Sequence, residues 1–459
     1  MDIDSEKYID GYIYRARKAQ SEYEKFTQEQ VDRIVKAAAK TVFDHAEDLA
    51  EFAVEETGVG VYEDKVIKNK NKARYIWNDL KDKKSVGIIE RDEKTGITKV
   101  AKPVGVVAAI TPMTNPIVTP MAKIMFALKG RNAIIITPHH RSKGCSTKTV
   151  ELINEAITKL GAPENIVQIL DIHSRENTKN LIANCDITAA TGGMGMVKAA
   201  YSSGKPALGV GAGNVQSIID DDADLDEAVP LIIKGRIFDN GIICSGEQSI
   251  IVSENKFDET VKILTENNTL VVTDDEDVVR LRNAIFDEQG HMNSHLIGQS
   301  VFKISEFAGV DIPEKTEMIA VLADGAGKQD VLSKEKMCPV IGLFRTKDFK
   351  DSVETARLNL EEEGKGHSVS IHSNNRENIE YAAETLSVSR FLINQACSYS
   401  AGGSFYNGLA PTNTLGCGTW GNNSFSENLT YYHLLNISRI ADYMPENYAP
   451  SDEELWGES

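Results

Sequence analysis

VGVVAAI at residues 104–110 and AIIIT at residues 133–137 are short, uninterrupted apolar runs that are rich in β-branched residues. Runs of this kind are typical of strands buried on both faces, as in parallel sheets. Similar runs recur at VQIL (167–170), ITAAT (187–191), SIIV (249–252), VIGLF (340–344) and SVSI (368–371). Segments with helical periodicity lie between them, at 146–160, 174–185 and 224–238. The alternation of strand and helix predicts an α/β fold with parallel sheets.

The sequence before these runs is predicted to be helical. Thr27 and Gln30 can form a capping box, and apolar residues follow at one-turn spacing. Gly58 and Gly60 are expected to end this helix.

Length and charge limit the organisation and the partners. A chain of 459 residues exceeds what one hydrophobic core usually serves, so two or three domains are expected. Boundaries are predicted near 218–224, where IIDDDAD becomes an acidic turn, and near 394–403, which is rich in small residues. The net charge of −18 disfavours nucleic acid and membrane surfaces as partners. The N-terminus has no pattern of a targeting signal, and a cytoplasmic location is expected.

The cysteines point to thiol chemistry and not to a metal. Six are spread along the chain without CxxC pairs or a histidine cluster at zinc spacing, so free thiols and no metal site are expected. Cys244 stands out because it lies in FDNGIICSGEQS, where Gly241 and Gly246 permit sharp turns. Such a loop can present a nucleophilic thiol beside backbone amides. A buried structural cysteine is the alternative.

Two further segments lie where strands are predicted to end. ITPMTNPIVTP (110–120) contains prolines that cannot continue a strand, and its Asn115 can offer an amide to a developing oxyanion. ATGGMGMV (190–197) joins a strand to a helix, and its glycines would let backbone amides approach a pyrophosphate. Taken singly, each is better explained as an ordinary turn.

Together, these segments resemble the aldehyde dehydrogenase superfamily. Asn115, Gly192 with Gly193, Cys244 and EKMCPV (335–340) occur in the family's order, and the resemblance covers about residues 15–445. It implies a Rossmann-like cofactor domain and a smaller α/β catalytic domain that holds the cysteine. The division expected is 1–218 for cofactor binding, 219–396 for catalysis, and 397–459 for a return to the cofactor domain and for oligomerisation.

Within that superfamily, FDNGIICSGEQS, EGKGHS and TLGCGTWGNNSFSEN are similar to the coenzyme-A-acylating branch, above all to succinate-semialdehyde dehydrogenases that form succinyl-CoA. Hydrolytic members carry a general-base glutamate in a segment that corresponds to LGVGAGNVQ, where Val210 takes its place. Without that carboxylate nothing obvious activates water, so coenzyme A becomes the expected acyl acceptor. The resemblance implies an aldehyde thiohemiacetal and then a thioester on Cys244.

The resemblance also assigns roles to other residues. Glu335 matches the glutamate that binds the nicotinamide ribose, with a surface glutamate as the alternative. His367 matches a histidine of the acylating branch, near the coenzyme or the acyl carbonyl, although a loop histidine is nearly as plausible. Residues at the strand ends and glycine turns are expected to bind the cofactor: Thr111, Pro112, Thr137, His139, His140, Arg141, Gly192, Gly193 and Gly211.

The segment IIITPHHRSK bears on the choice of cofactor. Many relatives have a lysine where Thr137 stands and a glutamate where His140 stands. Loss of a carboxylate that binds the ribose 2′-hydroxyl, with Arg141 and Lys143 nearby, favours NADP over NAD, and NAD stays open.

Several alternatives stay open for the substrate. The segment 394–408 is rich in Ser, Tyr and Asn and suits a polar or anionic aldehyde, with Ser400 as a candidate contact. Arg390 is a further candidate, although a structural role is the better explanation for it. Succinate semialdehyde is the first expectation, and sulfoacetaldehyde, acetaldehyde and butyraldehyde are the rivals. A hydrolytic dehydrogenase and a noncatalytic binding protein on the same fold are alternatives of other kinds. By analogy with relatives, a homodimer or homotetramer is expected.

Overall fold

The computed structural model describes residues 4–457, and this part of the chain opens with a layer of helices. They are α1 (Ser5–Tyr23), α2 (Gln28–Asp44), α3 (Ala46–Thr57) and α4 (Tyr62–Leu80). The predicted capping box is present at the start of α2, where Thr27 and Gln30 exchange side-chain and backbone hydrogen bonds. The predicted single helix up to Gly58 is two helices, because the chain turns at His45. Gly58 ends α3 in the left-handed conformation that glycine adopts without strain.

A parallel sheet of five strands follows, in the order β5-β4-β3-β6-β7. Its strands are β3 (Val106–Ile110), β4 (Ala133–Thr137), β5 (Val167–Ile169), β6 (Ile187–Thr191) and β7 (Ala207–Val210). The connecting helices are α5 (Val118–Lys129), η1 (His140–Ser142), α6 (Lys143–Thr158), α7 (Arg175–Asn184) and α8 (Met194–Tyr201). The chain runs outward from β3 to β5 and then returns to β6 beside β3. This reversal makes a topological switch point, where parallel sheets bind ligands at the carboxyl ends of their strands.

A second parallel sheet has seven strands, in the order β10-β11-β12-β9-β8-β13-β14. Its strands are β8 (Val215–Ile219), β9 (Glu247–Ser253), β10 (Thr269–Val272), β11 (Met318–Leu322), β12 (Val340–Thr346), β13 (Val369–His372) and β14 (Phe391–Ile393). The helices of this half are α9 (Leu225–Ile237), η2 (Phe238–Gly241), α10 (Glu254–Glu266), α11 (Asp275–Ile285), α12 (Val301–Ala308), η3 (Gly327–Gln329), η4 (Val331–Ser333), α13 (Phe349–Glu362), α14 (Arg376–Thr385) and α15 (Cys397–Ser400). The chain changes sheets between β7 and β8, slightly before the division expected after residue 218.

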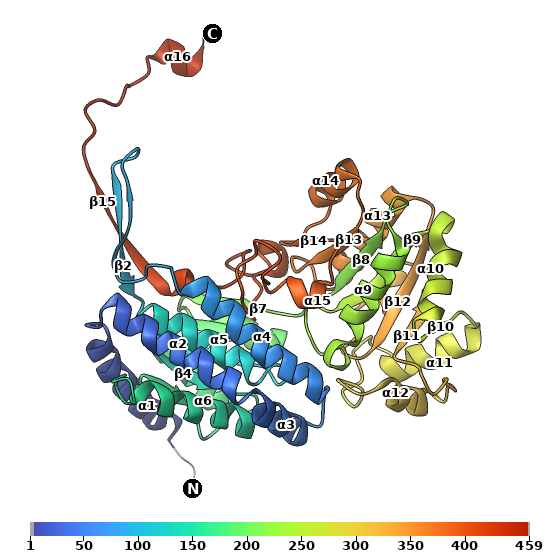
Figure 1. Ribbon diagram of the computed structural model, residues 1–459, viewed down its shortest axis with the longest axis horizontal. Helices are drawn as coiled ribbons and strands as arrows, with labels where there is room; N and C mark the ends of the chain where they lie inside the picture. The colour runs from blue at the N-terminus through green and yellow to red at the C-terminus, as the bar shows by residue number, and fades with distance from the viewer. Residues whose placement is uncertain (1–3, 458–459) are drawn as a thin grey trace.

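A small antiparallel sheet joins the two ends of the chain. It consists of β1 (Gly87–Asp92), β2 (Ile97–Pro103) and β15 (Leu435–Ala441), with β2 in the middle. Figure 1 shows this sheet projecting from the body, with the C-terminal segment beyond it. Short helices also lie in this last part of the chain: η5 (Thr419–Gly421), η6 (Tyr431–Leu434) and α16 (Asp452–Trp456). The C-terminal strand thus returns to the N-terminal half of the molecule.

The predicted α/β class with parallel sheets is confirmed. AIIIT and ITAAT coincide with β4 and β6, and the other quoted runs fall on β3, β5, β9, β12 and β13. β3, β4 and β9 are buried along their whole length, which is why their sequences show no polar alternation.

Candidate active site

Cys244 lies in the loop between η2 and β9. All six cysteines are free thiols, and Cys244 is the one that is not fully buried. Asp239, Asn240 and Gly241 adopt left-handed backbone conformations in succession, with φ of 54°, 50° and 73°. These residues fold the chain back sharply before Cys244. The loop therefore places Cys244 just before the amino end of β9, a central strand of the second sheet.

The surroundings of Cys244 disfavour its thiolate. Burial raises the pKa of the thiol to about 12, with Glu335 acting in the same direction and Arg390 opposing it. The thiol is thus protonated at neutral pH in the unliganded protein. Because the thiolate is the nucleophilic form, Cys244 has to be activated when substrate and cofactor are in place.

Asn115 follows β3 at the switch point of the first sheet. The Nζ atom of Lys68 donates to Asn115 Oδ1 at 2.9 Å. Asn115 Nδ2 has a single long contact among the described residues, to Thr114 Oγ1 at 3.4 Å. The amide oxygen is therefore occupied, and the amide N–H groups are free to donate to a ligand, as an oxyanion site requires.

His367 and Gly213 close the site from the other side. A Cβ atom built on Gly213 would lie 1.9 Å from the carbonyl oxygen of Cys244 and 3.2 Å from the ring of His367, so these three segments meet. His367 is buried, and neither ring nitrogen has a hydrogen-bond partner among residues 4–457. Burial, together with Arg390, lowers the pKa of His367 to about 3. A neutral ring with free nitrogens in the site is available to a ligand.

Glu335 lies at the same junction. Burial raises its pKa to about 8, Glu363 acts in the same direction, and the backbone N–H of Gly213 opposes both. The amide of Glu335 donates to the Glu363 carboxylate at 2.8 Å, which fixes the segment. A carboxyl group next to Cys244 and Gly213 is placed to meet a polar ligand that enters between the two sheets.

The residues expected to bind the cofactor gather at the carboxyl ends of the first sheet. Thr111 and Thr137 follow adjacent strands, and the Thr111 amide donates to the Thr137 carbonyl at 3.2 Å. Gly192 and Gly193 follow β6, the strand on the other side of β3, and a Cβ on either would meet no atom within 4 Å. Pro112 and Gly211 are half-buried beside the same strand ends. The arrangement leaves open space over exposed backbone amides, as a phosphate site requires.

Histidines and basic residues lie beside this edge. The rings of His139 and His140 are 4.3 Å apart, and His173 stacks 6.2 Å from His140. Burial, together with the neighbouring histidines and Arg141, lowers the pKa of His139 to about 4. Arg141 donates to the Thr57 carbonyl at 3.0 Å, while the ring of His140 is exposed. The described contacts of the His139, His140, Arg141 and His173 side chains include no carboxylate, although the Glu56 carboxylate accepts from the amides of Gly144 and Cys145 in the following turn.

Arg390 and Ser400 hold the protein together in the structure. The guanidinium of Arg390 donates to the His367 carbonyl at 2.8 Å and to the Gly416 carbonyl at 2.7 Å. It also contacts Ser368, Ser426 and Asn428. The Ser400 hydroxyl donates to the Ala396 carbonyl at 2.6 Å within α15. Arg390 therefore braces the His367 loop, and its N–H groups are not directed at a substrate.

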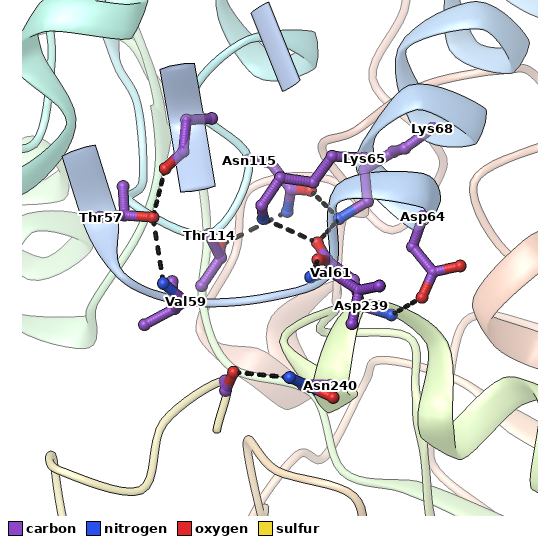
Figure 2. Close-up of polar contacts among 12 residues, drawn as sticks. Thr57, Val59, Val61, Asp64, Lys65, Lys68, Thr114, Asn115, Asp239 and Asn240 are labelled. Carbon is purple, nitrogen blue, oxygen red and sulfur yellow. Dashed lines mark hydrogen bonds and ion pairs between the residues drawn. The ribbon is translucent and has the colours of Figure 1, made fainter. Parts of the chain in front are cut away.

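Three lysines of α4 belong to the site but were not singled out from the sequence. Lys65 and Lys68 point toward Asp239, and Lys68 also reaches Asn115 (Figure 2), while Lys72 follows one turn later on the same face of the helix. Lys72 donates to the carbonyls of Gly402 and Thr412, at 2.9 and 3.2 Å. Burial lowers its pKa to about 8, and Cys244 is close enough to oppose that shift. The signal in the sequence was the spacing of lysines at positions where a helix normally places apolar residues.

Residues 3–413 match the aldehyde dehydrogenase family, and the chain belongs to that family. Within it, the relatives are acylating enzymes. The chain is 51% identical over 455 residues to the succinate-semialdehyde dehydrogenase (acetylating) of Clostridium kluyveri, covering 99% of this chain and 100% of that one. It is 39% identical to the sulfoacetaldehyde dehydrogenase (acylating) of Bilophila wadsworthia, covering 98% of each. It spans about half the length of the bifunctional aldehyde-alcohol dehydrogenases that it also matches.

Solved structures of acylating aldehyde dehydrogenases are also similar to this chain. An acetylating aldehyde dehydrogenase from Geobacillus thermoglucosidasius matches with a TM-score of 0.93 at 36% identity, over 97% of this chain and 98% of that one. A propionaldehyde dehydrogenase from Rhodopseudomonas palustris, with bound CoA and an acylated cysteine, matches with a TM-score of 0.84 at 26% identity, over 95% and 97%. The interpretation of the sequence as an acylating aldehyde dehydrogenase is thus confirmed.

The described residues contain neither a cluster of metal ligands nor a helix that could span a membrane. Among residues 4–457 no three or more His, Cys, Asp or Glu side chains are grouped so as to hold a metal ion. No helix in this part of the chain is both long and apolar enough to cross a membrane.

Proposed function

We propose that the protein oxidises succinate semialdehyde to succinyl-CoA through a thioester on Cys244, with NADP or NAD as hydride acceptor. The observation that carries this proposal is the meeting of Cys244, His367 and Gly213 in one place, with the amide of Asn115 free to donate. A relative with bound CoA and an acylated cysteine supports the use of CoA. An engineered glycolyl-CoA reductase with bound NADP+, 27% identical with a TM-score of 0.84 over 95% of this chain and 96% of that one, supports the cofactor.

In the proposed reaction, Cys244, Asn115 and His367 have separate roles. The sulfur of Cys244 adds to the aldehyde carbon, its proton leaves for solvent, and Asn115 Nδ2 with the Cys244 amide holds the oxyanion. A nicotinamide bound there would supply the hydride acceptor, and loss of hydride from the same carbon leaves an acyl thioester on Cys244. The sulfur of CoA then adds to the acyl carbon, the thiol proton of CoA passes to the departing Cys244 sulfur or to solvent, and the reaction is reversible because one thioester replaces another. His367, which stays neutral, can accept a hydrogen bond from the CoA thiol and orient it.

Val210 supports coenzyme A over water as the acyl acceptor. It ends β7 and is buried, so no carboxylate stands where hydrolytic relatives are expected to have their base. Glu335 is near Cys244, but we assign it to the cofactor ribose. A hydrolytic dehydrogenase is the alternative that this argument disfavours.

Lys72 supports an anionic substrate. Its ammonium is bound by two carbonyl oxygens and by no carboxylate among the described residues, and the half-buried side chain lies close to Cys244. A partly buried cation without a counterion is costly, and a substrate carboxylate would supply that counterion. Succinate semialdehyde and sulfoacetaldehyde both satisfy this requirement, whereas acetaldehyde and butyraldehyde do not. The greater identity to a succinate-semialdehyde dehydrogenase favours the carboxylate.

The residues beside the carboxyl ends of the first sheet support NADP over NAD as the cofactor. His140 is exposed beside His173, and Lys143 and Arg141 lie in the same segment, so this segment offers donors to a 2′-phosphate and carries no carboxylate of its own. We further propose that the first sheet with the N-terminal helices binds the cofactor, that the second sheet carries catalysis, and that the projecting β1-β2-β15 sheet serves a homodimer or homotetramer.

One assay tests the central claim. Reduction of NADP and of NAD is followed with succinate semialdehyde, sulfoacetaldehyde and butyraldehyde, each with and without coenzyme A. The proposal expects reduction that requires coenzyme A and is fastest with succinate semialdehyde. Equal rates without coenzyme A would make water the acceptor. The Cys244→Ala variant should bind the cofactor without turnover, and turnover in that variant would remove Cys244 as nucleophile.

A further inference from the structure

Lys68 lies between the Asn115 amide and the loop of Cys244. Its Nζ atom is 2.9 Å from Asn115 Oδ1 and 2.6 Å from Asp239 Oδ2. Lys65 contacts the same carboxylate oxygen at 3.0 Å but makes no hydrogen bond to Asn115 among the described contacts. Figure 2 shows the two lysines converging on Asp239 from one face of α4.

We propose that Lys68 is the positioning residue of the oxyanion site, which orients the Asn115 amide and ties it, through Asp239, to the loop that carries Cys244. This inference rests on the proposed function, because it needs Asn115 to bind the oxyanion. It assigns a role to a residue that touches neither the aldehyde nor the cofactor.

The orientation follows from donor and acceptor chemistry. An ammonium group only donates, so the amide atom that faces Lys68 has to be the oxygen. The planar amide then turns Nδ2 away from Lys68. Donation to the oxygen also polarises the amide, which makes its N–H groups stronger donors toward a developing negative charge.

The same lysine connects the amide with the nucleophile loop. Asp239 is fully buried in left-handed backbone, and it holds the amide of Val61 at 2.8 Å besides the two lysines. Such backbone persists where surrounding contacts fix it. The amide of Asp239 in turn donates to the Asp64 carboxylate at 2.7 Å. Both halves of the reacting geometry, donor and sulfur, are thus fixed to one carboxylate.

Little empty volume lies beside Lys68 and Asn115. The gap lined by Lys65, Lys68, Thr114 and Asn115 holds only about 10 Å³. That is at most the room for one water molecule. Water therefore cannot readily replace the ammonium of Lys68 in the wild-type protein.

The charge balance fits a role in the reaction. The two buried ammonium groups face one buried carboxylate, while Asp64 is only half-buried at the edge. Burial lowers the pKa of Lys65, and the lysines lower the pKa of Asp239 against the opposing effect of burial. The excess of positive charge next to Asn115 favours the amide orientation in which Oδ1 faces Lys68 and Nδ2 faces away from it.

The experiment compares Lys68→Met with Lys65→Met, each alone and combined with Asn115→Ala. Both lysines are equally buried and share Asp239, so Lys65→Met is the matched control. We expect Lys68→Met to lower kcat by about 10- to 100-fold with little change in KM, somewhat less than the loss of an oxyanion donor itself. Lys65→Met should lower kcat by less than about threefold, because Lys68 still holds both Asn115 and Asp239 in that variant.

The double variants decide whether Lys68 acts through Asn115. Lys68→Met should cost no more than about twofold in the Asn115→Ala background, because residues that act as one unit are not additive. Multiplicative losses, or equal losses for the two lysine variants, would overturn the inference. If Asn115→Ala itself keeps full activity, the proposed function fails first, and the two failures are thereby distinguished.

A measurement without an oxyanion separates positioning from misfolding. Alkylation of Cys244 by iodoacetamide should proceed in Lys68→Met at a rate within about twofold of wild type, because Lys65 and the Val61 amide still hold Asp239 and the reaction leaves the oxyanion site unused. A large change in this rate would assign Lys68 to the loop structure and refute the inference. Should Lys68→Met not fold, Lys68→Gln retains a donor for Asn115, and its kcat should lie between that of wild type and that of Asn115→Ala. A kcat at or below that of Asn115→Ala would count against the inference.

Discussion

Gly213 lies directly against Cys244, so that a Cβ atom on Gly213 would be 1.9 Å from the Cys244 carbonyl oxygen. No real Cβ contact is that short, and the carbonyl belongs to the backbone that positions the nucleophile. The segment after β7 therefore sets the depth at which the thiol projects. The backbone φ of Gly213 is not positive. Glycine is therefore required at this position for steric reasons and not for its conformational freedom.

Substitution of Gly213 is accordingly expected to disable the enzyme. Gly213→Ala should displace the Cys244 loop, lower the free energy of unfolding by about 1–3 kcal/mol and lower kcat more than the KM for the cofactor. Thermal melting and steady-state kinetics measure the two effects. Gly195→Ala, in α8 with no atom within 4 Å of the added Cβ, is the control and should melt at or slightly above the wild-type temperature. A Gly213→Ala variant with wild-type kinetics would contradict the contact.

The charge of Lys72 is expected to select anionic aldehydes. Lys72→Met should raise the KM for succinate semialdehyde by at least about tenfold, since an unpaired carboxylate would be left in a buried site. The KM for butyraldehyde should change little or fall. Steady-state kinetics with both aldehydes in the presence of coenzyme A provides the comparison. An equal rise for the two aldehydes would mean that Lys72 supports the loop through Gly402 and Thr412 and not the substrate.

The same lysine gives the enzyme a pH dependence. Burial lowers the pKa of Lys72 to about 8, so the side chain is charged below that pH and neutral above it. The carboxylate of succinate semialdehyde is ionised throughout this range. Its KM should therefore be lowest below about pH 8 and should rise as the pH increases through that value, while in Lys72→Met it stays flat. The bound carboxylate raises the lysine pKa further, so kcat should show the transition at higher pH than kcat/KM.

The extent to which the sequence predicts this protein differs between its parts. Buried parallel strands leave uninterrupted apolar runs, so β4 and β6 were located to the residue. The strands of the projecting sheet were not predicted, because β1, β2 and β15 are only partly buried and their sequences are mixed. The sequence singles out Cys244 and Asn115 because each lies beside residues that form turns, glycines in the case of Cys244 and prolines in the case of Asn115.

Residues whose role depends on contacts with residues distant in the sequence could not be predicted from the sequence. Lys68 meets Asp239 across a separation of 171 residues, and nothing local to either residue shows that contact. Arg390 illustrates the reverse case. Its sequence setting allowed a substrate contact, but the structure surrounds its guanidinium with protein carbonyls. Only the fold reveals which buried charges already have partners.

The raised pKa of Cys244 predicts slow alkylation of the unliganded enzyme. Because burial raises that pKa to about 12, the thiolate fraction and the rate of reaction with iodoacetamide should rise about tenfold per pH unit from neutral pH upward, with no plateau near pH 8. Mass spectrometry should locate the label on Cys244, and Cys244→Ala should not acquire it. A plateau between pH 6 and about 9 would show that the resting thiol is already activated, contrary to its surroundings.

His140 is expected to decide between the two nicotinamide cofactors. A glutamate in its place would repel a 2′-phosphate and accept hydrogen bonds from a ribose 2′-hydroxyl, so His140→Glu should raise the KM for NADP by at least about tenfold and lower the KM for NAD. His295→Glu, an exposed histidine of the second half of the chain, adds the same charge elsewhere and should leave both values near wild type. The ratio of kcat/KM for the two cofactors is the measurement. If His140→Glu and His295→Glu leave that ratio equally unchanged, the cluster of His139, His140 and His173 does not meet the cofactor, and the basis for expecting NADP disappears.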